Sequence, residues 1–127
     1  MNFSFEPSEG LVAVQVRLWG PQRRTVVRLA LDTGASETLV NWDIAVLLGY
    51  DPSTSPTRRQ ITTGSGVEFA PEISIARIEA LGMERLRFPV LCHTLPPSAG
   101  VDGLLGLDFL RGQRVLLDFR RGIIAVD

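Results

Sequence analysis

The sequence predicts a mostly β protein with one or two short helices, folded as a single domain over residues 1–127. This length is enough for one hydrophobic core but not for two. Twelve glycines and eight prolines divide the chain into short segments, and most of these are rich in the β-branched and aromatic residues that strands favour. One segment has the pattern of an amphipathic helix.

The first predicted element is a β-hairpin. Residues 11–19 (LVAVQVRLW) form its first strand, and Gly20 and Pro21 interrupt that strand. Residues 25–31 (TVVRLAL) form the second strand.

The predicted helix follows at residues 41–49. Asn41 suits the N-cap position and Gly49 suits the position just after the last helical residue. Ile44, Leu47 and Leu48 are spaced to share one apolar face.

The rest of the chain is predicted to be strands with one helical turn. Residues 58–96 form two or three strands, with a glycine-containing turn at residues 63–66. Residues 101–112 form an apolar strand that ends at Gly106 and a short helical turn after it. Residues 114–126 close the chain as a hairpin that turns near residues 120–122. Residues 29–40 and 101–112 share a pattern of apolar strand, glycine and second apolar run, which suggests two half-domains of related shape.

Composition excludes several classes of function. A formal net charge of −1 gives no electrostatic signal for nucleic acid or for an anionic membrane surface. A single cysteine cannot form an intrachain disulfide, and a single histidine cannot supply a His-Glu-x-x-His zinc site. We expect no metal and no cofactor. The start of the chain lacks the features of a signal peptide, and no apolar run is long enough to span a membrane. These features favour a cytoplasmic location, although the chain could come from a longer or membrane-anchored parent.

Two further groups of residues are predicted to be structural. Cys92 and His93 are neighbours on a strand, so their side chains point to opposite faces and do not form a thiol–imidazole pair. We expect a buried thiol beside a surface imidazole. The adjacent arginine pairs, among them Arg58 and Arg59, lie near predicted turns and are interpreted as solvated surface.

The carboxylates hold the clearest signal for chemistry. Most have a simple structural interpretation: Asp102 as a turn residue, Asp108 as a residue at a helix start, and Asp118 as the polar side of a strand. Asp32 differs, because it ends an apolar strand and is followed by Thr33 and Gly34 and then by small residues. These neighbours let other backbone segments approach, and hydroxyl and N–H groups can stabilise the ionised carboxyl.

The order of motifs resembles the retropepsin class of aspartic proteases. Asp-Thr-Gly-Ala-Ser at residues 32–36 is followed by a glycine-tipped hairpin, QITTGSGVEF, and then by Leu-Leu-Gly at residues 104–106. The resemblance covers roughly residues 11–126. The helix at residues 41–49 and the long closing hairpin are more similar to the retropepsin domain of DNA-damage-inducible ubiquitin-shuttle proteins and their bacterial relatives than to the shorter viral enzymes.

This resemblance implies a retropepsin-like closed β-barrel with a flap hairpin, which forms half of a dimeric aspartic protease. It implies catalytic roles for Asp32, for Thr33 in the contact that joins the two motif loops, and for Gly34 beside the carboxyls. It also implies that the substrate, a peptide or protein in extended conformation, contacts the following residues: Ala35, Ile61, Thr62, Thr63, Gly64, Ser65, Gly66, Val67, Leu104, Leu105 and Gly106. The nucleophile would be water, without a covalent intermediate.

The number of acids leads to a prediction about assembly. The reaction needs two carboxyls that share a proton, and this chain has one Asp-Thr-Gly motif. We therefore expect a homodimer with Asp32 of each copy on the twofold axis. The sequence leaves open which terminal strands join the subunits. Two alternatives also stay open: a dimerisation or peptide-binding module with little or no proteolysis, and a small β-barrel subunit in which Asp32 is only a turn residue.

Overall fold

The computed structural model describes residues 1–63 and 66–127 and is mostly β, as predicted. Its elements in chain order are β1 (Asn2–Ser4), β2 (Ala13–Trp19), β3 (Arg24–Leu31), β4 (Leu39–Val40), α1 (Trp42–Leu48), the 3-10 helix η1 (Pro52–Thr54), β5 (Arg58–Thr63), β6 (Gly66–Ala80), β7 (Met83–Cys92), the 3-10 helix η2 (Pro97–Ala99), β8 (Gly103–Leu105), α2 (Leu107–Leu110), β9 (Val115–Asp118) and β10 (Ile123–Val126).

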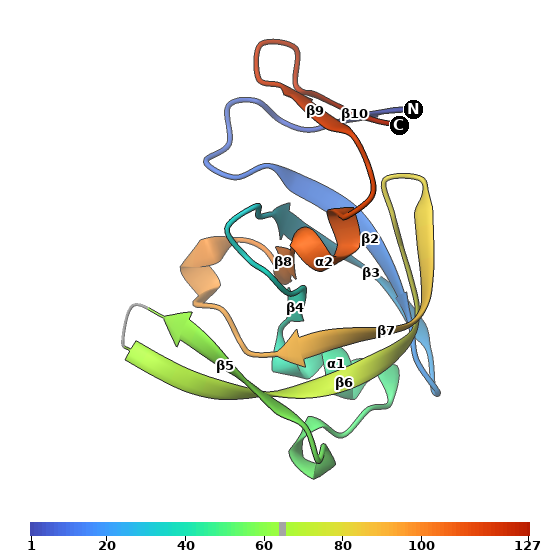
Figure 1. Ribbon diagram of the computed structural model, residues 1–127, viewed down its shortest axis with the longest axis vertical. Helices are drawn as coiled ribbons and strands as arrows, with labels where there is room; N and C mark the ends of the chain where they lie inside the picture. Colours follow the sequence, from blue (N-terminus) through green and yellow to red (C-terminus); the bar gives the residue numbers. More distant parts are fainter. Residues whose placement is uncertain (64–65) are drawn as a thin grey trace.

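Six of the strands close into a barrel (Figure 1). They follow the order β2-β3-β8-β4-β7-β6, and β6 pairs back with β2. Strand β2 shows the alternation expected of a strand with one face in the core, because Val14, Val16 and Leu18 are buried while the residues between them are exposed. The predicted hairpin of β2 and β3 and the closed barrel are both confirmed.

Helix α1 begins and ends as predicted. Asn41 is the N-cap and Gly49 is the C-cap in the left-handed conformation. Of the three apolar residues predicted to share a face, Leu48 is fully buried and Ile44 packs against the core, whereas Leu47 is 39% exposed. Ala45 is also fully buried. The small Ala45 side chain lets the helix approach the barrel closely, and the period of 3.6 residues turns Leu47 to the solvent side.

The predicted flap hairpin is formed by β5 and the first part of β6. Strand β6 has 15 residues: its second half belongs to the barrel, and its first half pairs with β5. Figure 1 shows this hairpin extending from the barrel. Its predicted turn, which includes Gly64 and Ser65, lies outside the described residues.

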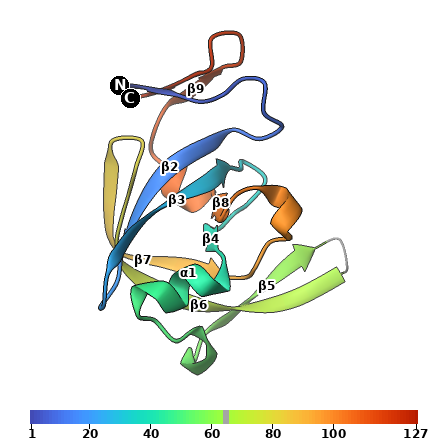
Figure 2. The same ribbon diagram turned by 180° about the vertical axis from the view of Figure 1, so that it is seen from behind.

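The two ends of the chain meet in a separate three-stranded sheet of order β1-β10-β9 (Figure 2). The closing hairpin of β9 and β10 is confirmed, and Phe5, Ile124 and Val126 join its inner face to the core. Asp118 lies in a strand as predicted, since it is the last residue of β9, and Val115 and Leu117 rather than Asp118 pack against the core. Its Oδ1 also accepts hydrogen bonds from the backbone N–H groups of Arg120 and Arg121, which fixes the turn.

Among the described residues, no helix combines the length and the hydropathy that crossing a membrane requires.

Candidate active site

Asp32 lies where β3 leaves the barrel. The last residues of β3 pair in parallel with β8, Ala30 opposite Leu104 and Leu31 opposite Leu105. The backbone N–H of Asp32 continues this ladder by donating to the carbonyl of Leu105 at 3.0 Å. The two segments with a shared sequence pattern are thus direct neighbours, and their pairing fixes the backbone that carries the acid.

The loop after Asp32 turns tightly around its carboxyl. The backbone N–H of Gly34 donates to Asp32 Oδ1 at 2.8 Å, and the N–H of Ala35 donates to the Asp32 carbonyl at 3.2 Å. A Cβ at residue 34 would lie 3.1 Å from Oδ1, which is a tight contact. Asp32 is half-buried, whereas Thr33 is exposed and its hydroxyl has no partner among the described residues. The motif therefore presents an ionisable carboxyl and a free hydroxyl at the surface of one chain.

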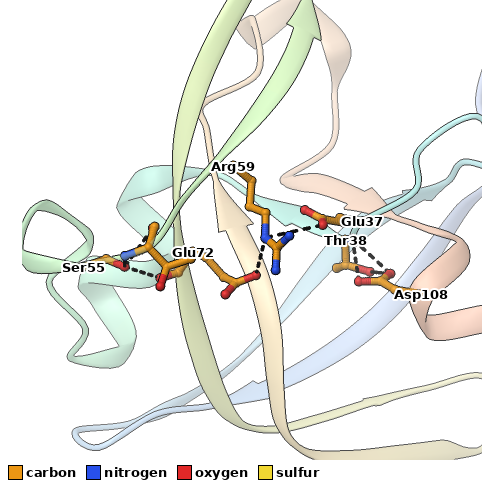
Figure 3. A network of polar contacts seen from close by, with 7 residues as sticks. Glu37, Thr38, Ser55, Arg59, Glu72 and Asp108 are labelled. Carbon is orange, nitrogen blue, oxygen red and sulfur yellow. Dashed lines mark hydrogen bonds and ion pairs between the residues drawn. The ribbon is translucent and has the colours of Figure 1, made fainter.

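A buried polar contact holds the far end of this loop (Figure 3). Thr38 is fully buried, and its hydroxyl donates to Asp108 Oδ1 at 2.7 Å while its backbone N–H donates to the same carboxylate at 3.0 Å. The Thr38 hydroxyl also accepts the N–H of Gly106 at 3.1 Å. Asp108 does lie in the first turn of α2 as predicted, but sequence reasoning missed that it binds Thr38. No short motif links two residues 70 positions apart.

Gly106 lets the two segments touch. A Cβ at this position would lie 2.8 Å from the carbonyl oxygen of Ala35 and 2.8 Å from the carbonyl carbon of Glu37. Immediately after it, the N–H of Leu107 donates to the carbonyl of Ala35 at 2.8 Å. The loop of residues 32–38 is therefore wrapped around the end of β8, and a side chain at residue 106 would push the two apart.

Next to Asp32 is a cleft of about 1070 Å³, whose lining includes apolar, neutral polar and charged side chains. The lining residues are Asp32, Gly34, Ala35, Ser36, Glu37, Leu39, Arg59, Gln60, Ile61, Thr62, Glu68, Leu91, His93, Thr94, Leu95, Pro96 and Leu104. We call residues 59–62 and 68, from β5 and β6, the hairpin wall, and the loop of residues 32–39 the body wall.

The structure brings some of the predicted substrate-contacting residues to this cleft and not others. Ala35, Ile61, Thr62 and Leu104 line it. Leu105 and Gly106 are buried behind the loop, where they position the body wall. Thr63 ends β5, but Gly64 and Ser65 lie outside the described residues. Gly66 and Val67 belong to β6 and do not line the cleft.

The hairpin wall carries charges that sequence reasoning interpreted as solvated surface. Arg59 lies between two carboxylates, with its Nε 3.2 Å from Glu72 Oε1 and 3.8 Å from Glu37 Oε1 (Figure 3). Arg59 is exposed, as predicted, and its ion pairs also join the hairpin wall to the body wall. A second pair joins β6 to the segment after β7, where His93 Nε2 lies 3.6 Å from Glu68 Oε2. The sequence signal for the position of Glu68 was the predicted hairpin, in whose register Glu68 lies opposite Ile61.

Cys92 and His93 point to different environments, as predicted. Cys92 is 1% exposed in the core, and burial raises the pKa of its thiol to about 12. The neighbouring His93 lines the cleft. A thiol that stays protonated at neutral pH is not a nucleophile, so the cleft contains no cysteine chemistry.

Within residues 1–63 and 66–127, no group of three or more histidine, cysteine, aspartate or glutamate side chains is arranged to hold a metal ion. What the cleft offers is an aspartate in a tight turn at Gly34, an extended hairpin beside it and a lining of apolar, neutral polar and charged side chains.

Comparisons with known proteins agree with this arrangement. Residues 22–112 match the family model described as gag-polyprotein putative aspartyl protease. No curated protein sequence matches the chain. Among solved structures, a retropepsin-like aspartic protease from Rickettsia conorii superposes with a TM-score of 0.74 over 99% of this chain and 88% of that one. The two are 17% identical, so this likeness establishes the fold.

Proposed function

The chain belongs to the gag-polyprotein aspartyl protease family, and from this premise we propose that it is an aspartic endopeptidase that acts as a homodimer. Two Asp32 carboxyls, one from each copy, would share a proton. One would accept a proton from the attacking water, while the other would donate a proton to the carbonyl oxygen of the scissile peptide bond. The observation that carries the proposal is the half-buried Asp32 in a tight glycine turn beside the cleft.

The charges in the cleft support a second acid from another chain. Besides Asp32, the carboxylates that line it are those of Glu37 and Glu68. Glu37 faces Arg59 and Glu68 faces His93. Both glutamates are thus engaged by partners on other segments, and neither belongs to an Asp-Thr-Gly motif. Asp32 of a second copy of the chain would supply the second carboxyl.

Exposed groups support a twofold contact. The hydroxyl of Thr33 has no partner in the described part of the chain and would contact the equivalent loop of the twin. The outer face of the terminal sheet also carries apolar residues, since Leu116 pairs with Ala125 in register and Leu116 is 54% exposed. We propose that the outer face and free edges of this sheet, which includes both chain ends, are buried in the dimer.

The cleft favours an extended peptide as substrate. Leu39, Leu91, Leu95 and Leu104 give it apolar lining, and the strands β5 and β6 border it. An extended peptide would add backbone hydrogen bonds, while the leucines would accept alternate side chains. Closure of the β5–β6 hairpin would exclude water from the reacting bond.

The direct test is cleavage of a peptide library between pH 3 and pH 8. We expect cleavage by the wild type and a loss of at least about a thousandfold in kcat/KM for Asp32→Asn, because amide for carboxyl removes the proton transfer. The matched control is Asp43→Asn in the exposed first turn of α1, which should keep activity. Absence of cleavage by a wild-type sample shown to be dimeric would favour the peptide-binding alternative.

A mixing experiment tests the shared site. When wild type and Asp32→Asn are mixed in equal amounts and allowed to exchange subunits, about a quarter of the dimers keep two carboxyls. The total activity of the wild-type chains should therefore fall to about half. Activity that stays constant as mutant is added, or an active monomer in sedimentation, would contradict the two-chain site.

A further inference from the structure

We propose that Glu68 determines substrate specificity by selecting a lysine or arginine side chain in the peptide. The proposal rests on the proposed protease function. The carboxylate of Glu68 would accept the cation of the peptide side chain in the part of the cleft that Glu68 and His93 line.

Glu68 is placed on the side of the hairpin that faces the cleft. It lies in β6 directly opposite Ile61 of β5, and both residues line the cleft. The neighbouring Val67 and Phe69 are more than half exposed and do not line it. Alternation along the strand thus gives the hairpin wall one inward carboxylate between outward apolar residues. A peptide bound along this wall would pass Glu68.

The ion pair that Glu68 makes is weak. Its side chain is 49% exposed, and its partner among the described residues is His93 at 3.6 Å, which is a cation only when protonated. Arg59, the other cation of the lining, is already held by Glu72 at 3.2 Å and Glu37 at 3.8 Å. Glu68 is therefore open toward the cleft, and within the part of the chain that the structure describes no permanently charged cation pairs with it.

The other charged residues that line the cleft also favour a basic peptide side chain. Asp32 and Glu37 line the cleft together with Glu68, and Arg59 is the one residue of the lining with a permanent positive charge. A basic peptide side chain therefore enters a region of net negative charge, which favours both its binding and its association rate. An acidic side chain at the same place is repelled.

The experiment uses pairs of peptides in which one residue is either lysine or norleucine, two side chains of nearly the same shape. This residue is placed in turn at each position on either side of the cleaved bond. At one position we expect kcat/KM for lysine to exceed that for norleucine roughly three- to fivefold at pH 7.5, the size of a half-exposed ion pair. Glu68→Gln should bring this ratio close to one.

The matched control is Glu84→Gln, which changes an exposed glutamate at the start of β7 that pairs with Arg77. It should keep the wild-type ratio. Equal cleavage of the lysine and norleucine peptides by the wild type at every position and at pH 7.5 would overturn the proposal and leave the protease function intact.

A binding measurement separates this proposal from the proteolysis. Fluorescent forms of the same peptides are titrated with Asp32→Asn and with Asp32→Asn combined with Glu68→Gln. Tighter binding of the lysine peptide to the first protein, lost in the second, supports the role of Glu68 even when no cleavage occurs. Equal binding of both peptides to both proteins overturns it.

Discussion

The two walls of the cleft are held by different chemistry. The body wall is fixed by a buried contact in which the Asp108 carboxylate receives the hydroxyl and the N–H of Thr38 at 2.7 and 3.0 Å. The hairpin wall is joined to the rest of the chain by ion pairs of 3.2 to 3.8 Å between partly exposed side chains, those of Arg59 and of Glu68 with His93.

This difference has a consequence for function. Buried hydrogen bonds to a charged group contribute about 1.5–3 kcal/mol each, whereas exposed ion pairs contribute about 0–1 kcal/mol and are screened by salt. The loop that carries Asp32 is therefore held in one conformation, while the hairpin can rearrange at small cost in free energy. An enzyme of this kind needs both properties, because the acid must be positioned and the substrate must enter.

The largest effect should follow from Gly106→Ala, which disturbs the body wall. The added Cβ would lie 2.8 Å from backbone atoms of Ala35 and Glu37, which cannot move without breaking the loop. We expect the free energy of unfolding to fall by about 3 kcal/mol. Urea denaturation measures it. Gly10→Ala is the matched control, because its Cβ meets nothing within 4 Å, and equal losses in the two variants would contradict the close approach.

The next effect tests the buried contact itself through Thr38→Val. Valine keeps the shape but leaves the N–H of Gly106 without its acceptor and removes one donor from Asp108. We expect a loss of about 2 kcal/mol in the free energy of unfolding and reduced cleavage activity, because the loop that carries Asp32 loosens. Thr62→Val in the exposed hairpin wall should change stability by less than about 0.5 kcal/mol. A similar loss in both variants would remove the distinction between the walls.

The sequence predicted the elements of the barrel better than the way they hold the cleft. Alternating apolar residues and glycine turns identified β2 with β3, the hairpin of β9 with β10, and the strand that ends at Gly106, because these signals are local. The contact of Thr38 with Asp108 and the charges around Arg59 were not predictable, because they join residues that only the tertiary fold brings together. The apolar pattern of α1 likewise gave the shared face of Ile44, Leu47 and Leu48 but not how much of each side chain the barrel covers.

Cys92 lies in the core, whereas its neighbour His93 lines the cleft. The burial of Cys92 predicts that the stability of the protein depends on pH in the alkaline range. Burial raises the thiol pKa of Cys92 from 9.0 to about 12, so between these values the unfolded chain loses a proton that the folded chain keeps. Stability therefore falls as pH rises above 9, by about 1.4 kcal/mol at pH 10. Chemical denaturation of the wild type and of Cys92→Ala, each below pH 9 and at pH 10, measures this loss of stability. If the difference between the two proteins does not change with pH, the thiol is not protected by burial.

The smallest effect should follow from Arg59→Gln, which removes the ion pairs between the hairpin wall and Glu37 and Glu72. Because the arginine side chain is 54% exposed, we expect a loss below about 1 kcal/mol at low salt and almost none at 0.5 M salt. Arg114→Gln, at an outer ion pair with Asp127, is the control for a general effect of charge. The salt dependence is the sharper observable, since the buried contact of Thr38 should be insensitive to salt. If Arg59→Gln costs as much as Thr38→Val and salt does not reduce the loss, then the hairpin wall is as firmly held as the body wall, and substrate entry requires a different opening.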